Sequence, residues 1–500
     1  MSSQISSEIE LSDLGTRRIR EAQDANMNGN GKHGNIDAIT RRGINGLNDT
    51  IVQHTYTGGE DEETSAEGTV RSDDNEDRPP DGGFKAYSVM IGSFFTILTN
   101  LGLINSIGAI QTYVSEHQLS DLSAINVSWI FSIYLCLAYG VGLFTGSTFD
   151  KRGPLELMVI SAVLLVADLF GAAYSKLVYQ FILSFIAVGI SNGLSITPSI
   201  GVMNHWFSNK KIGMIQGIST SAGSLGGLVF PLLLRFLYPN YGFTIALIIL
   251  GCICLGCMII GIVLIKERVK RKEPSEPSSS TERLESLSKW KKMREEAKVL
   301  SFKHLKDTRY TLLIVGAFFA ELALVMVITY FATYAIAQNV SESTSYILLT
   351  VWNATGILGR FIPGYGSDIF GKFNMNILML LGFNISIFAL WIPFGYNLKV
   401  LYAFAALGGF FLGLILSMVP ICLAQISLVV EFGERYGLLN FFVSIGNLFG
   451  IPIAAVIIGD GSIHNYNKFA IFVCVCSVVG TFFWYLSRYS IVGFKLNVKV

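Results

Sequence analysis

Long apolar runs alternate with short polar loops from about residue 86 to residue 487. About 20 apolar residues in a helix, at 1.5 Å each, cross a hydrocarbon layer of roughly 30 Å. Six runs lie at 86–113, 127–148, 155–175, 178–203, 212–237 and 242–265, and six more at 310–337, 344–366, 375–395, 398–424, 436–459 and 468–487. The pattern therefore predicts an all-α membrane protein with twelve transmembrane helices in two six-helix halves, 86–265 and 310–487.

The polar segments outside these runs divide the chain further. Residues 1–80 are rich in Gly, Asn, Ser and acidic residues and contain no apolar run, which predicts a disordered tail. They also lack the apolar core of a cleaved signal peptide, so we expect the first membrane helix to act as the targeting signal. Residues 488–500 form a short second tail.

A charged segment at 266–309 joins the two halves. Within it an apolar residue recurs at helical spacing among lysines and arginines, at Trp290, Met293, Ala297 and Leu300. This pattern predicts a basic amphipathic helix. It fits a helix lying on the inner leaflet and a solvated linker helix equally well.

Lysine and arginine in the short loops predict the orientation, because basic residues gather on the cytoplasmic side. The loops on the side of the tail hold Lys151, Arg152, Lys210, Lys211, Lys372 and Arg435, and the joining segment is densely basic. Both termini are therefore expected in the cytoplasm. We expect the plasma membrane, with the vacuolar membrane as the alternative.

Composition and motifs exclude several other classes of function. The net charge is +1, so nothing indicates a nucleic acid partner. No Walker A, HExxH or GxSxG motif occurs at a suitable position, so no catalytic residue is predicted. Cys254 and Cys257 form a CxxC inside an apolar run without further ligands, and we interpret them as packing residues. We expect no metal and no cofactor.

One short motif occurs twice, each time after the second span of its half. GSTFDKRG at 146–153 and GYGSDIFGK at 364–372 share Gly, three residues, Asp, two residues and Gly. The shared positions are Gly146, Asp150 and Gly153 in the first copy, and Gly364, Asp368 and Gly371, followed by Lys372, in the second. Equivalent positions on the same predicted side indicate a duplicated half.

The residue types in this motif predict a gating contact. Glycine lets two helices approach closely, and an aspartate can accept hydrogen bonds at the N-terminus of a neighbouring helix. A few kcal/mol from such a contact is enough to bias two arrangements of the halves. The alternative is a plain turn with a solvated aspartate.

The twelve spans and the paired motif resemble the major facilitator superfamily. The resemblance implies a major facilitator fold, in which two halves alternate access to a site near the midplane. The first copy departs from the usual pattern, because Pro154 stands where a basic residue is common. The second copy keeps its basic residue as Lys372.

A narrower resemblance concerns the monocarboxylate porters. PPDGGFKAYSVM before and into the first span, and NHWFSNKKIGMIQGISTSAGSLGG at 204–227, are similar to segments of that family. EFGERYG at 431–437 and GRFIPGYGSD at 359–368 resemble its fungal branch, which includes riboflavin carriers.

Four charges inside the spans stand out, because a charge at the bilayer centre costs about 2.5–3.5 kcal/mol on insertion scales. Asp168 and Arg235 lie nearer the outer ends of their spans, where snorkelling accounts for them. Glu321 lies in the seventh span and Arg360 in the eighth. They could form an ion pair between helices, or Glu321 could couple transport to protons. In proton-coupled members, a lysine in the first helix and an aspartate one turn before the arginine complete the site. Here Asn105 and Gly356 stand at those positions, which argues against a classical monocarboxylate carrier.

Amides and aromatic residues inside the spans suit a larger, mostly neutral solute. The candidate binding residues are Asn105, Asn192, Gln216, Glu321, Tyr330, Tyr334, Asn353 and Arg360. Any single amide can instead join two helices. The sequence thus predicts a monomeric, secondary-active transporter that uses alternating access, with riboflavin uptake as its function. The alternatives are a proton-coupled monocarboxylate transporter and a membrane nutrient sensor that does not transport.

Overall fold

A computed structural model describes residues 79–120, 122, 124–268, 302–495 and 498–499. All regular elements in these ranges are helices. The predicted disordered tail lies outside the described residues except for its last positions, and so does the predicted amphipathic helix that contains Trp290.

The first half contains five continuous helical stretches. These are α3 (Phe84–Glu116), α4 (Ala124–Gly140) with its continuation α5 (Gly142–Arg152), α6 (Pro154–Tyr174), α7 (Val178–Gly201) and α8 (Ile212–Leu264). Gly242 interrupts α8 with a φ of 77°, a conformation that glycine adopts readily. The 53 residues of α8 are therefore two helices that meet at a kink.

The second half repeats this order. It contains η2 (Phe302–Lys306), α10 (Thr308–Ala337), α11 (Glu342–Phe370), α12 (Lys372–Ser386) with η3 (Ile387–Trp391) and α13 (Ile392–Phe394), α14 (Leu398–Gly413), α15 (Ile415–Gln425), η4 (Val429–Glu431), α16 (Phe432–Ile458) and α17 (Ile463–Val492). In the first half a short 3-10 turn, η1 (Val202–His205), follows α7, at the place where η4 follows α15 in the second half.

The described helices account for twelve membrane crossings. Ten stretches are long and apolar enough to span a bilayer, and α8 counts twice because of its kink. The remaining crossing is α11, whose 29 residues are long enough but include Arg360. The predicted all-α fold is confirmed, and every predicted span falls on a helix. The last helix continues to Val492, beyond the predicted end at residue 487.

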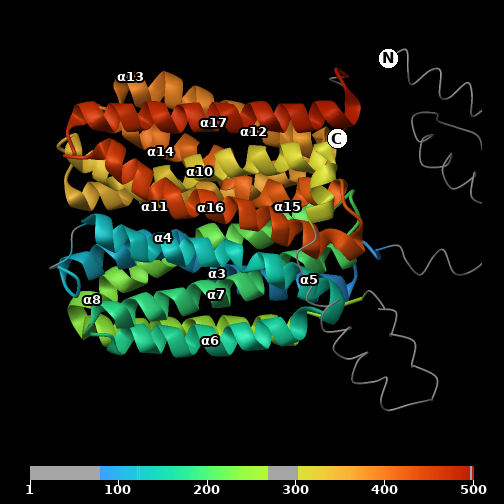
Figure 1. The fold of residues 1–500 in the computed structure, drawn as a ribbon, viewed down its shortest axis with the longest axis horizontal. Helices are drawn as coiled ribbons and strands as arrows, with labels where there is room; N and C mark the ends of the chain where they lie inside the picture. The colour runs from blue at the N-terminus through green and yellow to red at the C-terminus, as the bar shows by residue number, and fades with distance from the viewer. Residues whose placement is uncertain (1–78, 121, 123, 269–301, 496–497, 500) are drawn as a thin grey trace, which may run out of the picture. The chain divides into compact units, whose positions relative to one another are not determined.

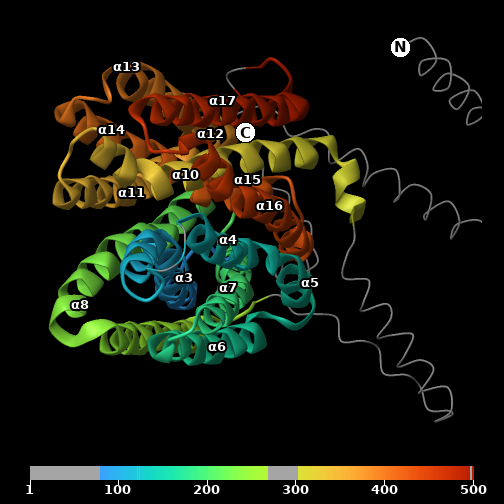
Figure 2. The same ribbon diagram turned by 60° about the vertical axis from the view of Figure 1, so that its left-hand side comes forward.

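The six-helix halves form two groups of helices that lie side by side (Figure 1). The second view shows the same division, with α3–α8 in one group and α10–α17 in the other (Figure 2). The groups meet where α8 packs on α11, and where α4 and α5 pack on α16. We call the end of the bundle that carries both motif copies the motif end; α5 lies there, on the right in Figure 1.

The second glycine of each motif copy ends one helix and begins the next. Gly153 separates α5 from α6 with a φ of 94°, and Gly371 separates α11 from α12 with a φ of 96°. Side chains other than glycine rarely adopt these angles. The repeated glycine therefore marks a tight reversal of direction between the second and third helices of each half.

Glycines also allow close contact between helices within a half. A Cβ atom on Gly359 of α11 would overlap the backbone of Phe410 in α14. A Cβ on Gly256, which is exposed on α8, would meet no atom within 4 Å. The two positions thus separate the effect of packing from the effect of helix propensity.

We expect Gly359→Val to destabilise the protein by about 1–3 kcal/mol, the usual cost of overpacking. Gly256→Val serves as the matched control and should leave the stability nearly unchanged. The measurement is the apparent melting temperature of the purified variants in detergent. Equal melting temperatures would contradict the close packing of α11 on α14.

Candidate functional site

A small cavity lies between the halves, away from the motif end. In this conformation it has room for little more than one water molecule, with a volume of about 10 Å³. Its wall combines residues of α3 and α8 from the first half with residues of α10, α11, α14 and α15 from the second. The polar groups in this wall are Asn105, Ser224, Asn353 and Arg360, and Trp352 adds a large aromatic face. Three of the predicted binding residues are therefore brought together here.

Arg360 is buried, with 3% of its surface exposed, and its guanidinium joins the two halves. Its Nε donates to the carbonyl oxygen of Gly413 in the second half at 2.9 Å, and its Nη1 donates to the carbonyl oxygen of Thr220 in the first half. A guanidinium can make several hydrogen bonds in one plane. Arg360 therefore acts both as a wall of the cavity and as a tie between the halves.

The two amides of the cavity use only their nitrogen atoms for internal contacts. Nδ2 of Asn105 donates to the carbonyl oxygen of Gly223 at 2.9 Å, and Nδ2 of Asn353 donates to that of Leu349 at 3.2 Å. Both side chains are only partly buried. Among the described residues no hydrogen bond reaches either side-chain oxygen, so both oxygens are available to a solute that donates hydrogen bonds.

Trp352 is a cavity residue that the sequence did not single out. Its ring packs against Phe331 and Phe404, with centroids 5.9 Å and 6.0 Å away, and these contacts hold it in place. The sequence offered one indication of this position: Trp352 directly precedes Asn353, a predicted binding residue in the middle of a span. Trp352 is buried in this conformation, with 4% of its surface exposed, so a solute could stack on its flat ring only after surrounding groups move.

The other predicted amides and tyrosines do not line this cavity. Asn192 donates to the hydroxyl of Tyr134 at 2.7 Å, and Gln216 donates to Asn204 at 3.1 Å. The hydroxyl of Tyr330 donates to the carbonyl oxygen of Ile451 at 3.1 Å. Tyr334 packs in an aromatic cluster, with its ring 5.4 Å from that of Trp391. In this conformation these four side chains join helices, the alternative already noted for the amides.

Glu321 is buried on α10, with 3% of its surface exposed. It lies one turn from Leu324, which lines the cavity. Its Oε2 has no hydrogen-bond partner, and no cationic side chain in the described part of the chain comes within ion-pair distance. Of the two possibilities for Glu321, the ion pair with Arg360 is not formed in this conformation, because the guanidinium is directed to backbone carbonyls instead. Glu321 is thus a buried carboxyl group without a compensating charge.

Each motif aspartate binds the N-terminus of a helix in the opposite half. Asp150 accepts hydrogen bonds from the backbone N–H groups of Gly433 and Glu434, at 3.1 Å and 2.8 Å. Asp368 accepts from those of Gly213 and Met214, at 2.9 Å and 2.8 Å. The first N–H groups of a helix lack internal partners and attract an anion. The hydrogen bonds expected from the motif are present, and we call the two contacts the Asp150 latch and the Asp368 latch.

The first glycine of each copy makes room for its latch. A Cβ on Gly146 would overlap the carbonyl oxygen of Gly433, and a Cβ on Gly364 would lie 2.9 Å from that of Gly213. Lys372 adds a further contact at the Asp368 latch, because its Nζ donates to Oδ1 of Asn209 at 3.2 Å. The halves therefore meet at the motif end through nearly bare backbone.

Comparisons with known proteins agree with this architecture. Residues 89–399 match the profile of the Major Facilitator Superfamily. The chain is 35% identical over 449 residues to the riboflavin transporter MCH5 of Saccharomyces cerevisiae, covering 87% of this chain and 85% of that protein. It is 29% identical over 384 residues to the aspyridones efflux protein apdF of Emericella nidulans, covering 76% and 73%. The structure resembles the human organic anion transporter MFSD10 with a TM-score of 0.60 at 14% identity, covering 81% of this chain and all of that one, which supports the fold alone.

We expect Arg360→Lys to lower stability by about 1–3 kcal/mol, although it keeps the charge. An ammonium group on a single nitrogen cannot reproduce the spread of a guanidinium that reaches carbonyls of both halves. Arg235→Lys is the control, since Arg235 is exposed on α8. The apparent melting temperature in detergent should fall for the first variant only, and an unchanged value would show that the tie contributes nothing.

Proposed function

The chain belongs to the Major Facilitator Superfamily and is a transporter of a small solute rather than an enzyme, and from this premise we propose that it carries riboflavin or a closely similar flat solute. The observation that carries the proposal is the cavity, where Trp352 stands beside two amide oxygens and a guanidinium. The similarity to a relative named as a riboflavin transporter supports the same solute.

The chemistry of the cavity matches this class of solute. Riboflavin combines a flat ring system, which has carbonyl oxygens and an N–H group, with a chain of hydroxyl groups. The ring of Trp352, which is buried in this conformation, would offer a stacking surface once the halves move apart. The oxygens of Asn105 and Asn353 can accept hydrogen bonds from N–H or O–H groups, and Arg360 can donate to a ring carbonyl.

The same wall argues against a monocarboxylate as the solute. Arg360 is the one charged side chain among the cavity residues, and two of its donors already bind backbone carbonyls. Gly356 lines the cavity one turn before Arg360, and Asn105 faces the same space. An anion would therefore meet one positive charge in this wall, because Asn105 stands where proton-coupled members carry a second one, whereas a neutral solute would not need it.

Alternating access gives the latches their function in this proposal. Ligand pockets usually measure about 300–1,000 Å³, whereas the cavity in this conformation has a volume of about 10 Å³. The halves must therefore separate at one end to admit the solute. The Asp150 and Asp368 latches hold the motif end closed, and breaking them lets that end open.

We place the motif end on the cytoplasmic side, with both termini, on the strength of the basic loops. Lys151, Lys210 and Lys372 all lie at this end of the described helices. Basic residues in short loops favour the cytoplasmic side. We assign the protein to the plasma membrane, where uptake from outside would begin with the motif end closed.

Cells that overexpress the protein should take up more labelled riboflavin than cells that lack it, whereas the two should take up labelled lactate equally. Trp352→Ala should reduce riboflavin uptake by about tenfold or more, since a stacking contact contributes about 1–3 kcal/mol per ring. Riboflavin uptake that does not change with the amount of protein would contradict riboflavin as the solute. Binding of riboflavin without net flux would indicate the sensor alternative instead.

We further propose that Glu321 takes up the proton that drives transport. A buried carboxyl group without a partner is held more easily as the neutral acid than as the anion. Glu321→Gln mimics the neutral form, so uptake should persist without responding to an imposed pH gradient or an uncoupler. Glu156→Gln, at an exposed position on α6, should leave the response intact. The same pH response in wild type and Glu321→Gln would rule out this role.

A further inference from the structure

The segment before the first helix of each half contacts the turn before the fifth helix of the same half. In the first half, residues 79–83 contact the turn at 206–211, which leads into α8. In the second half, residues 302–311 contact residues 426–435, which lead into α16. These two helices are the ones whose N-termini bind Asp368 and Asp150.

Asp81 makes the contact in the first half. Its carboxylate accepts from the backbone N–H of Ser208 at 2.5 Å and from the hydroxyl of Ser208 at 2.7 Å. Its carbonyl oxygen accepts from Nζ of Lys211 at 2.8 Å. The carbonyl oxygen of Ser208 in turn accepts from the N–H groups of Lys211 and Ile212, where α8 begins. Asp81 thus fixes the turn that sets the position of the first N–H groups of α8.

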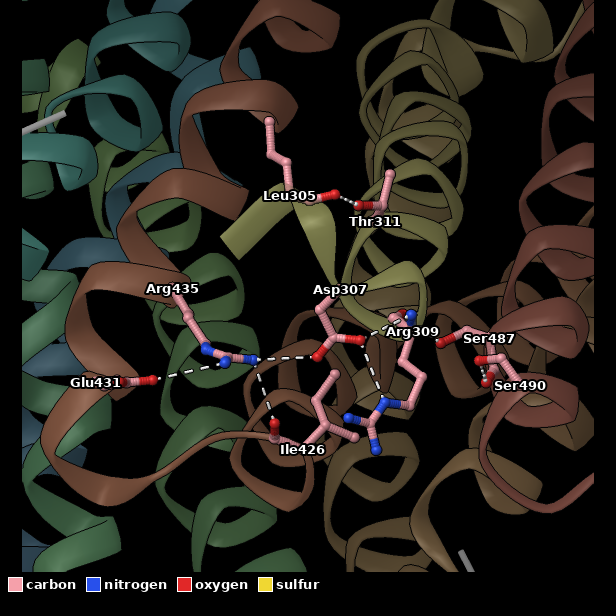
Figure 3. A network of polar contacts seen from close by, with 9 residues as sticks. All are labelled: Leu305, Asp307, Arg309, Thr311, Ile426, Glu431, Arg435, Ser487 and Ser490. Atoms are coloured by element: carbon pink, nitrogen blue, oxygen red, sulfur yellow. Dashed lines mark hydrogen bonds and ion pairs between the residues drawn. The ribbon is translucent and has the colours of Figure 1, made fainter. Parts of the chain in front are cut away.

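Asp307 makes the equivalent contact in the second half (Figure 3). Its Oδ2 lies 3.6 Å from Nη1 of Arg435, and its Oδ1 accepts from Nε of Arg309 at 3.2 Å. The hydroxyl of Tyr310, three residues further on, donates to the carbonyl oxygen of Arg435 at 2.6 Å. Arg435 directly follows Glu434, whose N–H binds Asp150. Asp307 and its neighbours thus hold the first turn of α16.

Geometry makes these contacts relevant to the latches. Each latch needs two adjacent N–H groups aimed at two carboxylate oxygens, and hydrogen bonds weaken steeply when their angle or distance changes. A helix end that shifts weakens both bonds of its latch together. Asp81 and Asp307 do not line the cavity, so they do not act on transport by contacting a solute there.

We propose that Asp81 and Asp307 are positioning residues, each of which keeps one helix N-terminus aligned for one latch. Asp81 acts on the Asp368 latch through α8, and Asp307 acts on the Asp150 latch through α16. This inference rests on the proposed function, in which the latches hold the motif end closed. It adds a specific pairing. We call Asp81 and Asp307 the braces, and each brace acts on one latch and leaves the other unaffected.

The test measures how often the motif end is open. Spin labels are attached to Leu155→Cys on α6 and Leu378→Cys on α12, which are exposed and contact neither braces nor latches. The seven native cysteines are first replaced, and the parent must retain transport. The distance distribution between the labels then gives the ratio of open to closed molecules in detergent or nanodiscs.

Asp81→Asn and Asp307→Asn are the brace variants. Asparagine keeps the shape of the side chain and tolerates the φ of 54° at position 81, so the change removes the charge with little strain. Each variant should raise the ratio of open to closed molecules by about threefold to tenfold. Asp307→Glu, which keeps the charge, should restore much of the closed population.

Combination with the latch variants distinguishes positioning from general destabilisation. Asp81→Asn should have no further effect once Asp368→Asn has removed its latch, but should keep its full effect beside Asp150→Asn. Asp307→Asn should behave in the opposite way. Additive effects in both backgrounds would overturn the proposal, because contacts that do not communicate add their free energies.

A matched control and a separate outcome complete the design. Asp460→Asn makes the same substitution at a fully exposed aspartate in the loop between α16 and α17, and should not change the distances. If Asp150→Asn and Asp368→Asn leave the ratio unchanged, the latches do not hold the motif end closed, and the proposed gating is wrong. If these two shift the ratio and the brace variants do not, only the positioning inference fails.

Discussion

Carboxylates bound to the N-termini of helices in the opposite half connect the two halves of this transporter at its motif end. Asp150 binds the start of α16, and Asp368 binds the start of α8. Both contacts need glycine on each side, since the backbones approach too closely for a Cβ atom. Polar hydrogen bonds and close backbone packing therefore depend on each other here. The two contacts occupy equivalent positions in the internal repeat, and Lys372 adds one further hydrogen bond at the Asp368 latch.

Much of this architecture could be predicted from the sequence. Apolar runs of sufficient length located all twelve crossings, because the thickness of the bilayer fixes the length of a spanning helix. The repeated motif predicted the hydrogen bonds of the latches, since glycine lets helices approach closely and an aspartate can accept hydrogen bonds at a helix N-terminus. The cavity residues Asn105, Asn353 and Arg360 were found because polar groups in a span are costly and therefore noticeable.

What could not be predicted depends on rotation of helices and on contacts between distant loops. A span that is apolar on all sides does not reveal which face meets lipid and which meets the other half. For this reason Trp352 was missed, and Asn192, Gln216, Tyr330 and Tyr334 were included although they join helices elsewhere. For the same reason the sequence left open whether Glu321 pairs with Arg360, which it does not do in this conformation. The contact of Asp81 with Ser208 joins positions 127 apart, and no local pattern indicates it.

The position of Arg360 has a consequence for how solute and protein influence each other. Its guanidinium holds a carbonyl from each half and also borders the space that a solute would enter. These carbonyls use two of the five N–H donors of the guanidinium, so a ring carbonyl could bind another donor of the same group. A solute bound there would contact a side chain that both halves hold, and its fit would depend on how the halves are arranged.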